Sequence, residues 1–236
     1  MIEEVKKLAF ELLSGDSSGH GADHVLRVYD LALKFAETEG ANQEIVALAV
    51  LLHDVDDYKL FGKESSENLT NAKKIMSSTN INNNTQEAVL DIIRTMGYSK
   101  YLKGIRPTSL EGKIVSDADM CDAIGANGIV RNIVYAVSGK GSGIIFDKNT
   151  YPNVDITHEQ YNSGKENHST NSAINHFFEK LLKLKDLMMT ESGKKEAIER
   201  QQIMVDFLKH FFKEENAPEW IVFLEKFLKG KDCKER

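Results

Sequence analysis

The stretch from Glu44 to Lys59, EIVALAVLLHDVDDYK, constrains this chain more than any other. Its eleven positions from Ile45 to Val55 hold only two polar residues, His53 and Asp54, and these are adjacent. The apolar run predicts a buried helix with a polar ending. An unpaired charge in a low-dielectric interior costs several kcal/mol, so the buried imidazole and carboxylate need partners. The sequence therefore predicts that His53 and Asp54 meet a metal ion, an ion pair or a substrate.

Composition narrows the class of protein. The chain has 236 residues, 41% of them hydrophobic and 28% charged, as in ordinary globular proteins. A net charge of −6 provides no general basic surface, so we expect no nucleic-acid partner. The distant Cys121 and Cys233 predict neither a disulfide framework nor a cysteine zinc site. No apolar run approaches the ~20 residues that span a bilayer, so we expect no membrane contact and a cytoplasmic location.

Apolar residues recur at three- and four-residue spacing almost throughout, which predicts an all-α fold. We expect one domain over residues 1–236, with a core at about 12–137, a loop or insertion at about 138–169 and C-terminal helices at about 170–230. One of these helices should run from Ile174 to Leu184. The polar segment Gly62 to Asn71 and the Asn-rich stretch STNINNNTQ are expected to be non-helical.

Further candidate ligands lie on either side of the opening stretch. His24 falls in the first turn of a helix that Ala22 or Asp23 should open. A later segment, KIVSDADMCDAIGANGIVRNIVYAV, places Asp117, Asp119 and Asp122 among apolar residues. Each residue alone is weak evidence, because a histidine at a helix start is usually a cap and an acid at a helix edge is usually solvated.

The order of these residues resembles that of the HD-domain superfamily of metal-dependent phosphohydrolases. The match is carried by His24 in DHVLRV, by His53 and Asp54 in LLHDVDDYK, and by Asp119 in KIVSDADMCDAIGANGIVR. The DAD, DAIGA and GI elements and the later NHFFEKLLKLKDLM resemble one bacterial-type subfamily of small stand-alone hydrolases. The resemblance covers about Leu12 to Phe212 and implies an HD-type helical bundle with a C-terminal helical extension.

This resemblance implies one divalent metal per chain, held by His24, His53, Asp54 and Asp119. Two imidazoles and two carboxylates form a mixed nitrogen and oxygen set, which favours manganese and also suits magnesium, iron, cobalt or nickel. Asp119 fits the family's Ala-Asp context better than Asp117 does. Asp117 remains the alternative ligand, or a residue that orients a histidine.

The resemblance also implies catalytic roles for Asp57, three residues after Asp54, and for His20, four residues before His24. Asp57 stands where related enzymes carry a glutamate, and could take a proton from the attacking water, a role worth about 10²- to 10⁴-fold in rate. His20 could donate a proton to the leaving oxygen. A solvated helix-end acid and a surface-loop histidine are the alternatives of about equal weight.

Phosphate contacts need positive charge, since phosphoryl transfer is catalysed largely by positioning and charge stabilisation. The candidates are Lys59, Arg131, His176 and Lys180, although lysines on helices are usually solvated. The expected substrate is a small phosphorylated molecule, a nucleotide first, with a nucleoside triphosphate cleaved to monophosphate and pyrophosphate. A 5′-nucleotidase, a guanosine tetraphosphate hydrolase and a non-catalytic nucleotide sensor are the alternatives. The sequence leaves a homodimer open.

Overall fold

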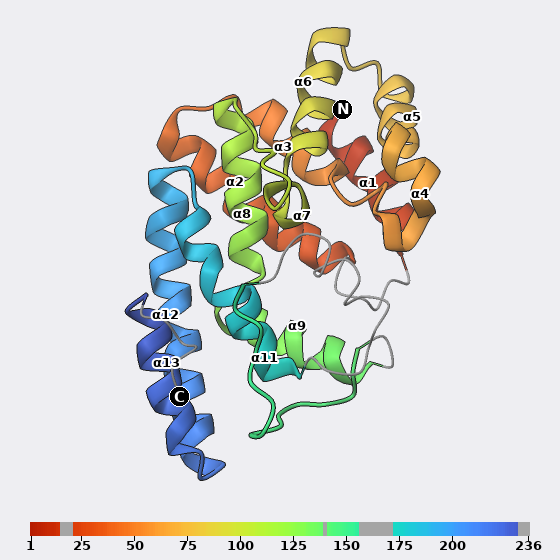
Figure 1. Ribbon diagram of the computed structural model, residues 1–236. Coiled ribbons are helices and arrows are strands. Elements are labelled where there is room, and N and C mark those ends of the chain that lie inside the picture. Colours follow the sequence, from red (N-terminus) through yellow and green to blue (C-terminus); the bar gives the residue numbers. More distant parts are fainter. Residues whose placement is uncertain (15–20, 139–140, 156–171, 231–236) are drawn as a thin grey trace. The chain divides into compact units, whose positions relative to one another are not determined.

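Helices make up nearly all the regular structure in a computed structural model that describes residues 1–14, 21–138, 141–155 and 172–230 (Figure 1). No strand occurs within these ranges, so the all-α prediction is confirmed. Of Lys59, only the backbone is described. The elements are α1 (Ile2–Leu13), α2 (Ala22–Glu39), α3 (Gln43–Leu52), α4 (Tyr58–Asn68), α5 (Thr70–Ser78), α6 (Asn83–Thr95), α7 (Tyr98–Tyr101), α8 (Leu110–Asp122), α9 (Gly125–Val137), α11 (Ala173–Glu179), the 3₁₀ helix η1 (Leu181–Leu187), α12 (Glu191–Glu214) and α13 (Pro218–Leu228).

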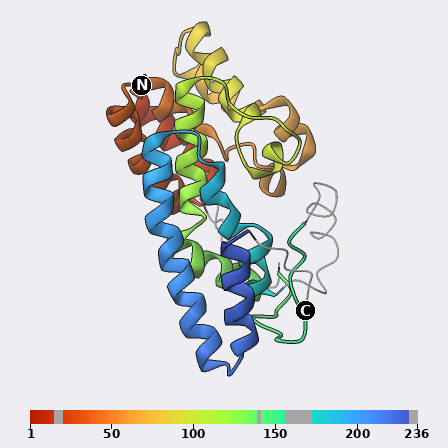
Figure 2. The same cartoon turned by 60° about the vertical axis from the view of Figure 1, so that its left-hand side comes forward.

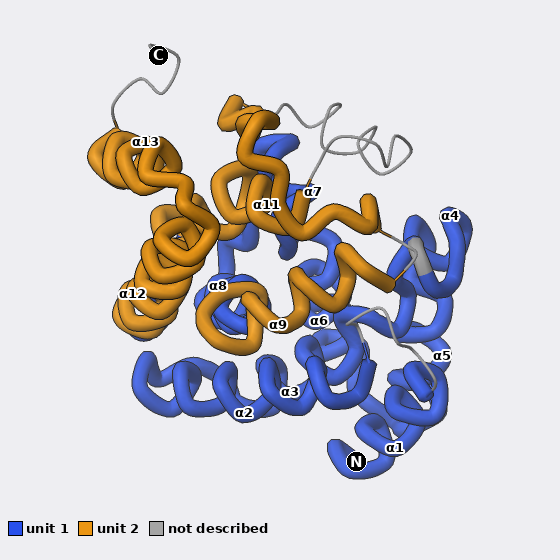
Figure 3. Tube along the Cα trace, turned by 90° about the horizontal axis from the view of Figure 1, so that it is seen from below, with its two compact units in different colours: residues 1–122, 188–194 blue, residues 123–187, 195–236 orange. Residues whose placement is uncertain are grey.

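The chain divides into two compact units, coloured separately in Figure 3. The first comprises Met1–Asp122 and Met188–Lys194, and the second comprises Ala123–Leu187 and Lys195–Arg236. Helix α12 therefore begins in the first unit and continues in the second. The single domain expected over residues 1–236 stays a prediction.

Helix α3 is the centre of the first unit. Asn42 caps its start, because the side-chain oxygen accepts hydrogen bonds from the backbone N–H groups of Glu44 and Ile45. All seven residues from Val46 to Leu52 are buried, and α3 contacts α1, α2, α6 and α8. Burial on every face distinguishes α3 from an ordinary surface helix with one apolar stripe. The apolar half of the opening stretch is thus enclosed by four neighbours.

Helices α2 and α8 bring further polar residues to the core. The apolar stripe of α2 is buried, and the helix starts at Ala22 as expected; its residues are Val25, Val28, Ala32, Phe35 and Ala36. It ends at Gly40, whose φ of 73° is the left-handed conformation that glycine tolerates best. Both α2 and α8 contact α3 and each other. Side chains at the start of α2, the end of α3 and along α8 can therefore meet.

The segment Gly62 to Asn71, expected to be non-helical, is helical, and the Asn-rich stretch is helical in part. Residues Gly62 to Asn71 lie in α4 and α5, with backbone breaks at Gly62 (φ 79°) and Leu69 (φ 52°). The buried Asp56 carboxylate accepts hydrogen bonds from the N–H groups of Asn71 and Ala72. This cap lies fifteen or sixteen residues from the helix that it stabilises, which is outside the reach of local patterns.

The Asn-rich stretch is the second such segment. The side-chain oxygen of Asn82 accepts a hydrogen bond from the N–H of Thr85 and opens α6 at Asn83. Asparagine favours loops in general but is also among the preferred N-cap residues. The non-helical part of the stretch is therefore shorter than expected.

The second unit has an aromatic core. Trp220 is fully buried, and its indole N–H donates to the carbonyl of Lys148. Its ring lies 4.6 Å from that of Tyr151 and 5.5 Å from that of Phe212, centroid to centroid.

Helices α12 and α13 of this unit run side by side in two views (Figures 1 and 2). Tyr151 belongs to the expected loop at 138–169, whose described part, 141–155, contains no helix.

One predicted helix of this unit is interrupted. The expected helix from Ile174 to Leu184 is divided into α11 and the 3₁₀ helix η1 by the non-helical backbone of Lys180 (φ −139°). Phe177 and Phe178 on α11 are fully buried. Among the described helices, none is long and apolar enough to cross a membrane.

Candidate metal centre

Three helices of the first unit supply the candidate ligands. His24 lies in the first turn of α2 and is 2% exposed. Helix α3 ends at Leu52, so His53 caps it and Asp54 follows in a turn. Asp119 lies on α8 and has a quarter of its side chain exposed. His53 lies just beyond the last residue of α3 but keeps helical backbone angles (φ −66°, ψ −31°), so the side chains of His53 and Asp54 both start from the C-terminal end of this helix.

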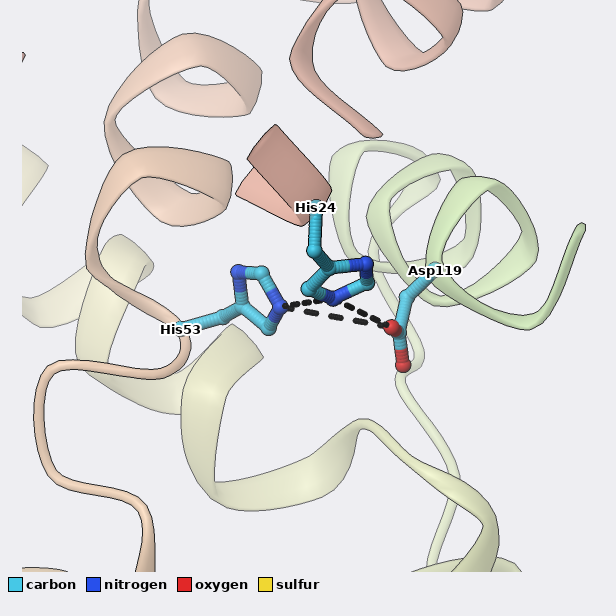
Figure 4. A group of neighbouring side chains, drawn as sticks. All are labelled: His24, His53 and Asp119. Atoms are coloured by element: carbon cyan, nitrogen blue, oxygen red, sulfur yellow. Dashed lines mark hydrogen bonds and ion pairs between the residues drawn. The ribbon is translucent and has the colours of Figure 1, made fainter. Parts of the chain in front are cut away.

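The side-chain nitrogen and oxygen atoms of these four residues that could bind a metal lie close together. His24 Nε2 lies 3.3 Å from His53 Nε2 and 3.5 Å from Asp119 Oδ1 (Figure 4). Asp54 Oδ2 lies 3.6 Å from His24 Nε2 and 3.4 Å from His53 Nε2. The group formed by His24, His53 and Asp119 has all its donor atoms within 4.8 Å of one another. The structure thus brings together the four residues predicted as ligands.

Hydrogen bonds to Nδ1 determine what each imidazole presents at Nε2. His53 Nδ1 lies 2.7 Å from the carbonyl oxygen of Val50, and His24 Nδ1 lies 2.7 Å from Asp122 Oδ2. A carbonyl or carboxylate oxygen only accepts, so both Nδ1 atoms carry the proton. In the neutral rings, both Nε2 atoms then present lone pairs to each other across 3.3 Å. Such an arrangement requires a cation between or beside the two nitrogens.

The electrostatics of the group favour positive charge. Burial lowers the pKa of His24, but hydrogen bonds to Asp119 and Asp122 and the charge of Asp54 outweigh burial and raise it to about 9. Burial raises the pKa of Asp119, yet the hydrogen bond to His24 and the charges of His53 and His24 hold it below its usual range. A metal ion would take the place of this proton at Nε2.

The residues present fit a divalent metal ion. Ligand atoms about 2.1 Å from a metal and about 90–110° apart are themselves about 3.0–3.5 Å apart. The closest separations of these atoms, 3.3–3.6 Å, lie near the upper end of this range, and His53 Nε2 is 4.0 Å from Asp119 Oδ1. Two imidazole nitrogens and two carboxylates suit a borderline or hard metal such as manganese.

Asp117, the alternative ligand, has a different role. It is fully buried, and its carboxylate accepts hydrogen bonds from the N–H groups of Met189 and Thr190 and from the Thr190 hydroxyl. A Cβ added at Gly193 would lie 2.4 Å from Asp117 Oδ2, so only glycine fits there. Asp117 therefore fastens the segment Met188–Lys194 to α8 and lies outside the ligand group.

Asp122 is the partner of His24 that the sequence interpretation missed. The sequence offers Asp117 as the residue that orients a histidine, whereas in the structure Asp122 is hydrogen-bonded to His24. Asp122 follows Asp119 by three residues, a spacing that places two side chains on one face of a helix. Arg27, three residues after His24, donates from Nε to Asp122 Oδ1 at 2.7 Å. These two spacings place Asp122 near Asp119 and Arg27 near His24, but they do not identify the contact between the two helices.

The remaining predicted site residues lie in several places. Asp57 is half-buried just before α4, and its N–H donates to the Asp54 carbonyl at 3.1 Å. His20 and the side chain of Lys59 lie outside the described residues. Half-buried residues of the second unit complete the set: Arg131 on α9, His176 on α11 and Lys180 at the end of α11.

Known proteins resemble this chain in sequence and in fold. The sequence model of the HD domain matches residues 21–124. YpgQ from Bacillus subtilis is 33% identical over 213 residues, covering 90% of this chain and 92% of YpgQ. A crystal structure of a Lactobacillus plantarum protein has 37% identity and a TM-score of 0.76, and covers 92% of this chain and 97% of that one. An HD-superfamily hydrolase from Bacillus thuringiensis has 32% identity and a TM-score of 0.68, with the same coverage.

The HD domain match spans all four converging residues, from His24 to Asp119. The chain therefore belongs to the HD superfamily. It is a hydrolase of that superfamily, as the order of its histidines and aspartates predicts.

Replacement of Asp54 tests the ligand group. We expect Asp54→Ala to reduce metal content from about one ion per chain to near zero, because it removes a carboxylate in contact with both Nε2 atoms. Elemental analysis after dialysis measures the ratio. Asp30→Ala, which removes an exposed carboxylate from α2, is the matched control. Full metal content in Asp54→Ala would contradict the proposed site.

Replacement of Asp117 tests the separate role of that residue. Asp117→Asn places an amide against three donors, so we expect a loss of about 1–3 kcal/mol in the free energy of unfolding. Urea denaturation followed by circular dichroism measures this loss, and the folded variant should keep the wild-type metal content. Loss of metal at unchanged stability would instead place Asp117 among the ligands.

Proposed function

We propose that this chain is a metal-dependent phosphohydrolase that cleaves a nucleoside triphosphate to the monophosphate and pyrophosphate. The observation that supports it most directly is the pair of Nε2 atoms 3.3 Å apart, each belonging to a ring whose Nδ1 proton is already donated. Two carboxylates border the pair. One divalent metal ion, manganese first, would be held by His24, His53, Asp54 and Asp119.

The proposed reaction divides its tasks between the metal and the protein. A divalent ion, when bound, lowers the pKa of water and polarises a phosphoryl oxygen. Asp57 would accept a proton from the attacking water. Its N–H donates to the Asp54 carbonyl, so its backbone is held close to that of a proposed ligand. His20 would donate a proton to the leaving oxygen.

Positive charge is needed to bind the phosphates. Lys59 follows Asp57 by two residues, while Arg131, His176 and Lys180 belong to the second unit. We assign these four residues to the phosphate groups, which carry the charge that develops in phosphoryl transfer. Lys180 stands where the α11 helix is interrupted, so its side chain starts from a backbone that departs from helical geometry.

A nucleotide is the favoured substrate class. YpgQ, a relative of this chain, has been crystallised in complex with ADP, and that structure has 29% identity and a TM-score of 0.63, covering 91% of this chain and 97% of YpgQ. A nucleoside diphosphate shares its base, sugar and first two phosphates with the triphosphate. The likeness extends over nearly the whole of both chains, so we propose that this chain also binds a nucleotide.

A panel of nucleotides tests the proposed reaction. With Mn²⁺ present, we expect nucleoside triphosphates to yield monophosphate and pyrophosphate, and chelation with EDTA to stop turnover. Chromatography of the nucleotides and a pyrophosphate assay identify both products. Phosphate release from monophosphates would instead indicate a 5′-nucleotidase, and pyrophosphate release from guanosine tetraphosphate alone would indicate that hydrolase. Thermal stabilisation by nucleotide without any turnover would indicate a sensor.

Replacement of Asp57 separates proton transfer from metal binding. Asp57→Ala should lower kcat by about 10²- to 10⁴-fold because it removes the general base, while the metal content stays near one per chain. Glu67→Ala, which removes an exposed acid from α4, is the control and should leave both values unchanged. Loss of the metal from Asp57→Ala would move this residue into the ligand group.

A further inference from the structure

Asp122 is a buried acid outside the proposed ligand group. It is the last residue of α8 and is 2% exposed. Its Oδ2 accepts the Nδ1 proton of His24 at 2.7 Å, and its Oδ1 accepts from Arg27 Nε at 2.7 Å. Arg27 Nη2 adds a contact to Oδ2 at 3.2 Å. The carboxylate therefore joins a histidine of the metal centre to an arginine.

Arg27 compensates the burial of this charge. A carboxylate removed from water costs several kcal/mol unless it is paired and hydrogen-bonded, and the two-point guanidinium contact does both. Hydrogen bonding to Asp122 raises the pKa of Arg27 above its ordinary value, so the guanidinium stays charged. Arg27 also donates from Nη1 to Asp23 Oδ2 at 2.8 Å. Its side chain is thus held at both ends of the guanidinium group.

The two histidines of the centre are supported in different ways. His53 donates its Nδ1 proton to the Val50 carbonyl, one of the last carbonyls of α3, which have no partner within the helix. That support is backbone and survives any side-chain replacement. His24 instead depends on the Asp122 carboxylate. A substitution can therefore remove the support of one histidine and leave the other intact.

We propose that Asp122 is a positioning residue that fixes the orientation and tautomer of His24, and that Arg27 holds the Asp122 carboxylate in place for this task. The inference rests on the metal site in the proposed function. The carboxylate keeps the proton on Nδ1, so that Nε2 faces His53 and Asp119 with its lone pair. Acids that support a metal-binding histidine in this way typically change metal affinity by about 10- to 100-fold.

Metal titration of matched variants tests the proposal. We expect Asp122→Asn to bind Mn²⁺ about 10- to 100-fold more weakly than wild type in isothermal titration calorimetry. Asp122→Glu, which keeps the negative charge, should recover part of the loss. Asp30→Asn is the matched control, because it makes the same replacement at an exposed position of α2, and its affinity should equal that of wild type.

A spectroscopic measurement separates positioning from general stability. In the Co²⁺-loaded protein, the Nδ1 protons of His24 and His53 should give two exchangeable, shifted proton resonances in NMR. Asp122→Asn should broaden or lose the His24 resonance and keep that of His53. A merely structural role, in which Asp122 only fastens α2 to α8, would leave both resonances in place in the folded variant.

The outcomes distinguish this inference from the proposed function. Wild-type affinity and both resonances in Asp122→Asn would overturn the inference alone, provided that wild type binds metal and Asp54→Ala does not. Absence of Mn²⁺ binding to wild type would overturn the metal site and the inference together. If Asp122→Asn does not fold, Arg27→Gln is the second test of the inference. We expect this variant to bind Mn²⁺ up to about 10-fold more weakly and to exchange the Nδ1 proton of His24 faster with water. Unchanged affinity and exchange in Arg27→Gln would then refute it.

Discussion

Two imidazole nitrogens face each other across 3.3 Å at the centre of the first unit, and each ring has its proton on the opposite nitrogen. Lone pairs at this distance repel unless a positive charge lies near both. The surrounding carboxylates of Asp54 and Asp119 supply negative charge, which a proton on His24 or a metal ion can balance. The close positions of the four side chains are compatible with one another because the group as a whole attracts a cation.

The helices around this group account for its rigidity. Helix α3 is enclosed on every side, so its end cannot shift without exposing apolar side chains. The carbonyl of Val50 near that end is satisfied by the ring of His53 rather than by water. On α8, two neighbouring aspartates have separate tasks, since Asp119 faces the histidines and Asp117 holds the segment Met188–Lys194. The same helices thus carry both the core and the candidate centre.

Much of this arrangement could be predicted from the sequence, because it depends on local patterns. The apolar run before His53, the stripe of α2 and the ending at Gly40 follow from periodicity and from glycine's backbone freedom. The convergence of His24, His53, Asp54 and Asp119 was implied by their order along the chain. Asp56 and Asp122 could not be assigned in this way, because their partners lie 15 and 98 residues away in sequence. Periodicity shows that such acids are buried, but only three-dimensional contacts show what they bind.

The hydrogen bonds of Asp117 also affect the order in which the structure can form while the chain is being synthesised. Its hydrogen-bond partners Met189 and Thr190 lie 72 and 73 residues further along, so the first unit is discontinuous in sequence. At a synthesis rate of about 5–20 residues per second, these partners follow α8 from the ribosome after about 4–14 s. Until then the Asp117 carboxylate must be hydrated, which keeps this side of α8 open to water. The contacts that cover Asp117, on the helix that carries Asp119, can therefore form only after most of the chain has been synthesised.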